Sequence, residues 1–358
     1  MFSINKLIRE NIKNLQPYSS ARSEFKGNAE VFLDANENGF GAPCPASTPL
    51  GLTIDAWHMN RYPDPLQIKL KDKLSSIKGL PIQNIFLGNG SDEVIDLLFR
   101  AFCNPGVDSV IIVPPTYGMY EVSANINDVF VKKVPLTPDF QLDIDSISVA
   151  STERTKLIFI CSPNNPTGNS INREDIEIIL NNFQGLVVVD EAYINYSRQH
   201  SFIKELTEYP NLVVMQTLSK AWGLAGARIG MAFASEEIIE VMNRIKPPYN
   251  IGQPAQEIAI EALNNVEQIN EWIKITVQER ANLAKALTGI SIVKNIFASD
   301  SNFLLVKVED PDLLYHYLVK NGIIVRDRSK VILCEGCLRI TVGTPEENSS
   351  LVEVMKKY

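Results

Sequence analysis

Four short runs of consecutive apolar residues constrain the fold of this chain more than any other feature. The runs are VIIVPP (110–115), KLIFICSP (156–163), LVVVDEAY (186–193) and LVVMQTLSK (212–220), and helix-like segments separate them. Continuous apolar runs, unlike alternating ones, are typical of strands that helices cover on both faces of a sheet. We therefore predict an α/β fold in which a large lobe contains a mostly parallel sheet covered by helices.

The pattern changes after Pro254, where a long segment of helical period begins and leads to strands with fewer helices between them. These strands are SNFLLVKV (301–308), GIIVRD (322–327) and CLRITVG (337–343). We expect a large domain at residues 31–250 and a smaller α+β lobe at 251–358. We expect residues 1–30 to join the small lobe, with a short amphipathic helix near the start of the chain.

Composition narrows the classes of function. The net charge is −8 over 358 residues and no basic block stands out, so we expect no nucleic-acid partner. The N-terminal residues carry charges and no apolar run, which predicts a cytoplasmic protein without a membrane anchor. The five cysteines are an odd, scattered set, which indicates reduced thiols. Cys334 and Cys337 form a lone C-x-x-C with no second pair and no nearby histidine, which favours two unrelated thiols beside a strand over the alternative of a zinc or redox site.

A lysine and an arginine follow the last apolar run. Lys220 stands at the end of the run beside the hydroxyls of Thr217 and Ser219, and Arg228 follows in a stretch rich in Gly and Ala. A lysine at a buried strand end can have a lowered pKa and act as an amine nucleophile. Arginine binds phosphate through paired N–H donors. The alternative interpretation is a solvated surface lysine.

Polar residues also follow the other runs, and ligands of open α/β sheets bind beyond the carboxyl ends of the strands. Asp190 closes a run of valines, although it could simply cap a helix. Asn165 lies between two prolines in SPNNPTG, which could be a plain turn. Gly90, Ser91 and Asp92 precede an amphipathic helix whose N-terminus can bind an anion, although Ser-Asp-Glu is also a common helix start.

Taken together, these residues match the groups of one cofactor, pyridoxal phosphate. Lys220 would hold its aldehyde as a Schiff base, and Asp190 would keep its ring nitrogen protonated. Asn165 and Tyr193 would donate to its phenolate oxygen, and Tyr117 would stack on the ring. The expected phosphate clamp, with Thr217 beside it, consists of Gly90, Ser91, Asp92, Ser219 and Arg228.

The motifs S-P-N-N-P-T-G, D-E-A-Y and S-K-A-W-G-L-A-G-A-R-I-G, in this order and spacing, resemble the fold-type I pyridoxal-phosphate aminotransferases. The resemblance extends over nearly the whole chain. It implies an aspartate aminotransferase-like large lobe with a mostly parallel, seven-stranded sheet. It also implies that Lys220, Asp190 and Tyr193 are catalytic, with freed Lys220 as the general base.

Within that family, the chain is similar to the histidinol-phosphate aminotransferase branch in LQPYSSAR, LDANENGFG, NRYPDP, IIVRDRSK and CLRITVGTPEEN. This resemblance implies transfer of an amino group between L-histidinol phosphate and 2-oxoglutarate, giving imidazole-acetol phosphate and L-glutamate, in histidine biosynthesis. It implies a homodimer in which Tyr62 reaches the cofactor phosphate and substrate of the neighbouring subunit. Tyr18, Arg326 and Arg339 would bind the substrate phosphate, and Asn165 would also contact the substrate.

Several alternatives remain open at this point. Arg326 and Arg339 could form surface salt bridges with acids such as Asp327 or Glu335. The chain could be another fold-type I enzyme, namely an aromatic or aspartate aminotransferase or a threonine-phosphate decarboxylase. A non-catalytic pyridoxal-phosphate-binding regulator is a further alternative, although such proteins carry a DNA-binding domain for which this chain has no basic segment.

Overall fold

The computed structural model describes residues 2–16 and 59–358, which form a large lobe and a smaller one. The large lobe contains a seven-stranded sheet with the strand order β1-β7-β6-β5-β4-β2-β3. Its strands are β1 (Ile85–Asn89), β2 (Ser109–Ile112), β3 (Phe130–Lys133), β4 (Thr155–Cys161), β5 (Leu186–Asp190), β6 (Leu212–Thr217) and β7 (Ile229–Phe233). Only β7 is antiparallel to its neighbours, so the predicted mostly parallel sheet is confirmed.

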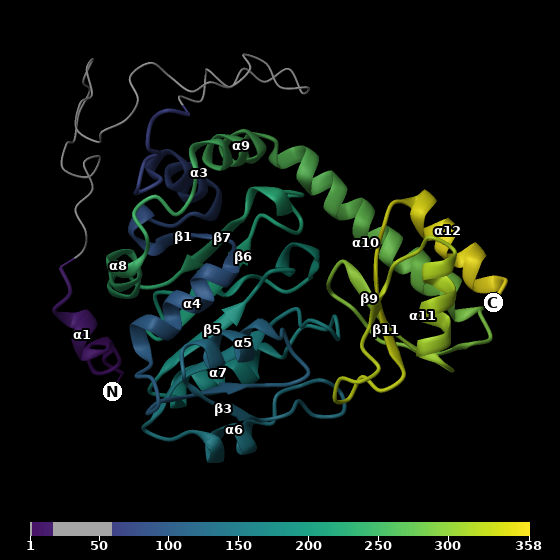
Figure 1. Cartoon of the computed structure of the whole chain (residues 1–358), viewed down its shortest axis with the longest axis horizontal. Coiled ribbons are helices and arrows are strands. Elements are labelled where there is room, and N and C mark those ends of the chain that lie inside the picture. The colour runs from purple at the N-terminus through teal and green to yellow at the C-terminus, as the bar shows by residue number, and fades with distance from the viewer. Residues whose placement is uncertain (1, 17–58) are drawn as a thin grey trace.

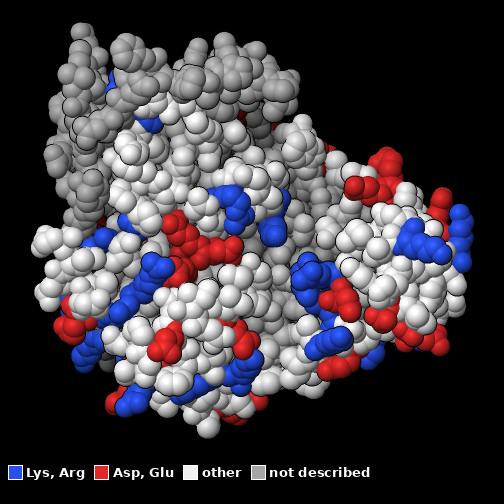
Figure 2. Space-filling view, in the orientation of Figure 1, with Lys and Arg blue, Asp and Glu red and all other residues white. Residues whose placement is uncertain are grey.

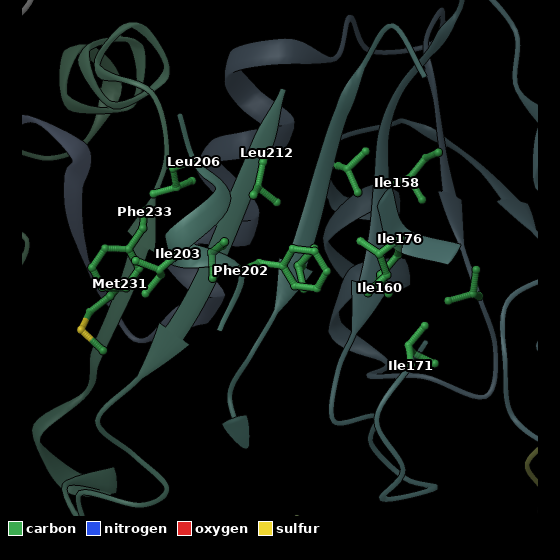
Figure 3. Packing of buried hydrophobic residues seen from close by; sticks show 14 of the residues in the cluster. Ile158, Ile160, Ile171, Ile176, Phe202, Ile203, Leu206, Leu212, Met231 and Phe233 are labelled. Atoms are coloured by element: carbon green, nitrogen blue, oxygen red, sulfur yellow. The ribbon is translucent and has the colours of Figure 1, made fainter. Parts of the chain in front are cut away.

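Helices cover both faces of this sheet, which explains why its central strands are apolar throughout. Ile158 and Ile160 of β4 belong to one buried cluster, whereas Phe159 between them belongs to the other. The first cluster includes α7 (Arg173–Asn182) and the short helix η5 (Phe202–Glu205). Figure 3 shows Ile158, Ile160 and Leu212 extending from the strands among Ile176 and Phe202 of those helices.

The remaining helices of the large lobe are divided between the two faces. The helices α4 (Ser91–Phe102), α5 (Met119–Ile126) and α8 (Glu236–Ile245) contribute to the cluster around Phe159. The helices α3 (Ile68–Lys78), α6 (Ile144–Ala150) and α9 (Gln253–Asn264) contribute to the cluster on the opposite face. Short 3-10 helices occur at Ile82–Asn84 (η3), Ile194–Tyr196 (η4) and Ala225–Ala227 (η6).

The small lobe contains an antiparallel sheet of four strands in the order β10-β11-β9-β8. The strands are β8 (Val293–Ile296), β9 (Phe303–Val308), β10 (Arg326–Asp327) and β11 (Cys337–Thr341). The helices α11 (Pro311–Lys320) and α12 (Pro345–Lys356) pack on it through a third buried cluster that includes Leu314 and Leu351. This lobe is the predicted α+β unit.

The boundaries of the two lobes differ from the expected ones at two places. The 23-residue helix α10 (Val266–Thr288) joins them (Figure 1), with Ile269 in a large-lobe cluster and Leu283 in the small-lobe cluster. The transition therefore falls within α10, because α9 still packs on α3.

The N-terminal segment packs on the large lobe, although we expected it to join the small one. It forms a 3-10 helix at Ile4–Lys6 (η1) and an α-helix at Glu10–Lys13 (α1). Ile4 and Ile12 are buried in the cluster of α4 and α8, and Arg244 of α8 donates to the Lys13 carbonyl oxygen. The apolar face was thus predicted, but its partner was not.

The charged surface is mixed in sign. On the face seen in Figure 2, acidic and basic side chains of the described residues alternate over both lobes. Among the helices that the structure describes, none combines the length and the apolar character needed to cross a bilayer.

Candidate active site

A cavity of about 730 Å³ lies where the carboxyl ends of β4, β5 and β6 meet the N-terminus of α4 and the β10–β11 edge of the small lobe. Such an edge is the usual ligand site of an open α/β sheet. The predicted residues that line it are Ser91, Asp92, Tyr117, Asn165, Asp190, Tyr193, Thr217, Ser219, Lys220, Arg228, Arg326 and Arg339. Gly90 adjoins the cavity through Arg228, whereas Tyr18 lies outside the described residues.

Lys220 follows β6 and reaches the cavity, where its side chain is accessible. Partial burial of its amine lowers the pKa of Lys220, and the positive charge of the Arg339 guanidinium lowers it further. The negative charge of Asp190 acts in the opposite direction. Its Nζ lies 5.5 Å from the centre of the Tyr193 ring. A lysine with a lowered pKa keeps more of its amine neutral, as a nucleophile or a base must.

Asp190 ends β5 and is 4% exposed. Its Oδ2 accepts a 2.7 Å hydrogen bond from the Tyr120 hydroxyl, and its Oδ1 accepts one of 3.0 Å from the Ala192 backbone N–H. Burial raises the pKa of Asp190, while these two hydrogen bonds and the Lys220 charge oppose that rise. A buried carboxylate held in this way is suited to pair with a cationic ring nitrogen.

The N-terminus of α4 forms a cradle for an anion. Gly90 precedes the helix with φ of 78°, and no side chain caps the first turn. A methyl group on Gly90 would lie 2.4 Å from Arg228 Nη2, and one on Gly230 would lie 2.2 Å from the Ser91 backbone nitrogen. Because Gly90 has no side chain, the Arg228 guanidinium can lie against the α4 N-terminus, and because Gly230 has none, β7 can lie against the backbone of Ser91. The backbone N–H groups of the first turn and the guanidinium are therefore close together, as an anion site requires.

Arg228 is held at this cradle by its own backbone. It adopts a left-handed conformation with φ of 54°, and its carbonyl oxygen accepts a 2.8 Å hydrogen bond from the Gly90 N–H. Its Nη2 lies 3.4 Å from Asp92 Oδ2. The Tyr117 hydroxyl donates to the other oxygen of Asp92 at 3.1 Å. Asp92 thus orients both side chains at the cavity wall.

The hydroxyl of Thr217 also has a defined position. Thr217 Oγ1 donates to the Ile229 carbonyl oxygen at 3.1 Å and accepts from the Ser219 backbone N–H at 3.0 Å. Thr217 therefore shapes the turn that presents Ser219 and Lys220. Tyr62 does not line the cavity; it is 51% exposed and its ring stacks on Tyr249 at 4.4 Å.

Asn165 and Arg339 connect the two lobes across the cavity. Arg339 Nη1 donates a 2.6 Å hydrogen bond to Asn165 Oδ1, which leaves the amide NH₂ of Asn165 as its remaining donor. The Arg339 guanidinium lies 5.2 Å from the Phe303 ring, and its Nε is buried without a hydrogen-bond partner among the described residues. Phe303 also contacts Tyr193 edge to face at 5.2 Å.

The alternative of surface salt bridges is not observed. Within residues 2–16 and 59–358, neither Arg326 nor Arg339 forms an ion pair. Asp327 Oδ1 instead accepts the Ser329 backbone N–H at 2.7 Å, and Glu335 Oε1 accepts that of Leu333 at 3.2 Å. The two arginines thus face the cavity without an ion-pair partner in the part of the chain that the structure describes.

Sequence reasoning missed two residues of the site. Tyr120 lies on α5, one helical turn after Tyr117, and its ring stacks on Phe159 of β4 at 4.7 Å. Arg328 lines the cavity with Arg326, from which it is separated by two positions. Arg328 lies one residue beyond the segment predicted as a strand (322–327), and its spacing from Arg326 was the signal in the sequence that the two side chains could share a face.

The cavity residues fit pyridoxal phosphate by their chemistry. The uncapped first turn of α4 and Arg228 suit a phosphate, and the buried Asp190 suits a protonated ring nitrogen. Lys220 supplies an amine on the same wall. In the described part of the chain, no group of three or more His, Cys, Asp or Glu residues could hold a metal ion.

Comparison with known proteins shows the family of the chain. The family model described as aminotransferase class I and II matches residues 34–355. A histidinol-phosphate aminotransferase of Cytophaga hutchinsonii is 52% identical over 357 residues, which are 100% of this chain and 99% of that protein. One from Parabacteroides distasonis is 53% identical over 356 residues, 99% of each chain. The solved histidinol-phosphate aminotransferase of Clostridium acetobutylicum is similar with a TM-score of 0.77 and 26% identity, covering 84% of this chain and 90% of that one.

Proposed function

Because the chain belongs to the family of class I and II aminotransferases, we propose that it transfers an amino group from L-histidinol phosphate to 2-oxoglutarate. The products are imidazole-acetol phosphate and L-glutamate, and the reaction serves histidine biosynthesis. The two relatives that share about half of their residues with this chain over its whole length carry that activity in their names. The observation that carries the proposal is the pair Arg326 and Arg339, which face the cavity without acidic partners among the described residues.

Enzymes of this family use pyridoxal phosphate. The helix N-terminus at Gly90, Ser91 and Asp92 would hold its phosphate together with Ser219 and Arg228. When bound, the cofactor withdraws electrons from the carbon that carries the substrate amine, which makes the hydrogen on that carbon acidic. Tyr117 would lie against the ring.

The residues around Lys220 have distinct tasks in this proposal. Lys220 Nζ takes the proton from the substrate Cα, for which its lowered pKa is suited. Asp190 pairs with the protonated ring nitrogen, and Tyr120 and the Ala192 N–H keep that carboxylate oriented. The hydroxyl of Tyr193 and the amide NH₂ of Asn165 would donate to the phenolate oxygen, since Asn165 Oδ1 is already engaged by Arg339.

The same cations would bind both substrates. Arg326 and Arg339 would hold the phosphate dianion of histidinol phosphate through paired N–H donors, and Asn165 would lie beside it. In the second half-reaction, Arg339 would bind a carboxylate of 2-oxoglutarate. Tyr18, which lies outside the described residues, is proposed for the phosphate on the strength of the resemblance alone.

We further propose a cytoplasmic homodimer in which Tyr62 serves the neighbouring active site. Tyr62 is half exposed, stacks on Tyr249 and does not line the cavity of its own chain. The described cysteines, Cys103, Cys161, Cys334 and Cys337, are all free thiols, as is usual in a reducing compartment.

We also propose that the large lobe extends to the first turns of α10, because Ile269 of that helix packs in a large-lobe cluster.

The proposal is tested by mixing the purified enzyme with L-histidinol phosphate and 2-oxoglutarate and measuring glutamate. We expect catalytic formation of glutamate, and none with Lys220→Ala. Threonine phosphate, phenylalanine and aspartate are tested alongside as amino donors. Release of carbon dioxide from threonine phosphate without a need for 2-oxoglutarate would identify a decarboxylase instead, and a faster reaction with phenylalanine or aspartate would identify an amino-acid aminotransferase.

A further inference from the structure

A third arginine of the small lobe faces the cavity beside the two that were predicted there, Arg326 and Arg339. Arg326 of β10 pairs directly with Arg339 of β11 in the antiparallel register. Arg328 follows Arg326 by two residues, and all three line the cavity. We propose that Arg328 is a specificity-determining residue that binds the phosphate dianion of the amino substrate. This inference rests on the proposed function and adds a residue to its phosphate site.

The backbone holds Arg328 firmly at this position. Its N–H donates a 3.0 Å hydrogen bond to the Cys337 carbonyl oxygen, which extends the pairing beyond β10. Its carbonyl oxygen accepts a 2.9 Å hydrogen bond from the Val331 N–H, and Val331 also lines the cavity. Since Arg326 and Arg328 are separated by two positions along an extended segment, both side chains lie on the face toward Arg339.

Among the described residues, no acidic side chain lies within ion-pair distance of the Arg328 guanidinium, although the charge of Asp327 acts on it from further away. Over residues 2–16 and 59–358 it forms no ion pair, and its guanidinium makes one hydrogen bond, a long one of 3.4 Å to the carbonyl oxygen of Asp327. The Asp327 carboxylate accepts the Ser329 N–H instead. Burial lowers the pKa of Arg328, and the like charges of Arg339 and Arg326 lower it further.

The positive charges of Arg326, Arg328 and Arg339 on one side of the cavity repel one another unless a bound anion neutralises them. Arg326 lies directly opposite Arg339 in the sheet, an arrangement in which like charges are unfavourable, and a third cation adds to the repulsion. A phosphate monoester near neutral pH carries close to two negative charges, whereas a carboxylate carries one. The third guanidinium therefore favours the phosphate of the amine over the carboxylates of the second substrate.

The test compares half-reactions of the holoenzyme for three amines: L-histidinol phosphate, L-histidinol without its phosphate, and L-glutamate. The variants are Arg328→Gln, Arg328→Lys and, as a matched control, Lys330→Gln, which removes one charge from the exposed part of the same loop. For histidinol phosphate we expect Arg328→Gln to lower kcat/KM roughly 10- to 100-fold, mostly through KM, as for loss of a charge-assisted hydrogen bond. Histidinol and glutamate should lose less than about threefold, Arg328→Lys should recover part of the loss, and Lys330→Gln should change nothing.

A second measurement separates this inference from the proposed function. The rise in melting temperature of the holoenzyme on adding inorganic phosphate is compared between wild type and Arg328→Gln, and we expect the variant to lose most of the rise. Failure of the wild type to use histidinol phosphate overturns the proposed function, while loss of the phosphate effect still supports Arg328 as an anion ligand. Equal losses for all three amines, or an undiminished phosphate effect, overturn the inference.

Discussion

The hydroxyl of Tyr120 donates a 2.7 Å hydrogen bond to Oδ2 of Asp190, and both side chains are buried. Burial raises the pKa of Asp190, and this hydrogen bond is the largest of the influences that hold it down. The buried surroundings of Asp190 favour its neutral form, and the hydrogen bond from Tyr120 favours its charged form. In the proposed function, that charge is required opposite the cofactor ring nitrogen.

Replacing Tyr120 by Phe should raise the pKa of Asp190, because the charged form loses a donor. A donor that stabilises the charged form lowers the pKa of an acid, so its loss acts in the opposite direction. We expect the acid limb of the kcat/KM profile against pH to move to higher pH. The control is Tyr196→Phe, since Tyr196 is also buried and its hydroxyl makes no hydrogen bond within the described residues. An unmoved limb in Tyr120→Phe, or an equal shift in both variants, would contradict this role.

Replacing Gly90 by Ala should weaken cofactor binding. The new methyl group would lie 2.4 Å from Arg228 Nη2, and the residue would keep a φ of 78° that disfavours any side chain. The guanidinium must then move from the α4 N-terminus, and we expect the dissociation constant of pyridoxal phosphate to rise at least about tenfold. Titration of the apoenzyme followed by absorbance measures it.

The matched control for Gly90 is Gly226→Ala, because a methyl group there meets nothing within 4 Å. This variant should bind the cofactor as the wild type does. If Gly90→Ala binds equally well, the cradle does not need the close approach of Arg228. If both variants lose the same affinity, the effect belongs to the loop in general.

Glu191 should make stability depend on pH. It is 1% exposed, accepts the Phe202 N–H at 2.7 Å and the Gln216 amide at 2.9 Å, and burial raises its pKa to about 7. An unfolded glutamate has a pKa of about 4.3, so the folded protein binds more protons between the two values and stability falls as pH rises through that window. Over the whole window the fall attributable to Glu191 is on the order of 4 kcal/mol, at about 1.4 kcal/mol per pKa unit.

The Glu191 prediction is measured by urea unfolding at several pH values between 5 and 8. Glu191→Gln should show a flatter dependence than the wild type, whereas Glu240→Gln, at an exposed position of α8, should leave the slope unchanged. Parallel curves for Glu191→Gln and the wild type would show that Glu191 does not titrate in this range.

The sequence predicts those parts of the fold that depend on local pattern. Ile158 and Phe159 are neighbours that enter opposite buried clusters, so the continuous apolar run was a direct consequence of burial on both faces. Asp190 and Lys220 follow adjacent strands of a parallel pair, and the carboxyl ends of such strands meet at one edge. Their proximity could therefore be predicted without any knowledge of register.

The features that were missed depend on long-range placement. The apolar face of residues 4–12 indicates that the segment packs on something, but only tertiary structure shows that its partner is α4. Tyr120 resembles any aromatic residue on the buried face of a helix, and its partner Asp190 is 70 residues away. Arg328 requires the pairing of β10 with β11, which brings it beside Arg339.

We propose that Lys220 carries the cofactor. The most direct measurement treats the holoenzyme with borohydride, which fixes pyridoxal phosphate to the amine that holds it, and locates the label by peptide mass spectrometry. We predict a single labelled lysine, Lys220, and no fixed label in Lys220→Ala. A label on a different lysine, or none in a wild-type enzyme that contains the cofactor, would show that Lys220 does not hold it.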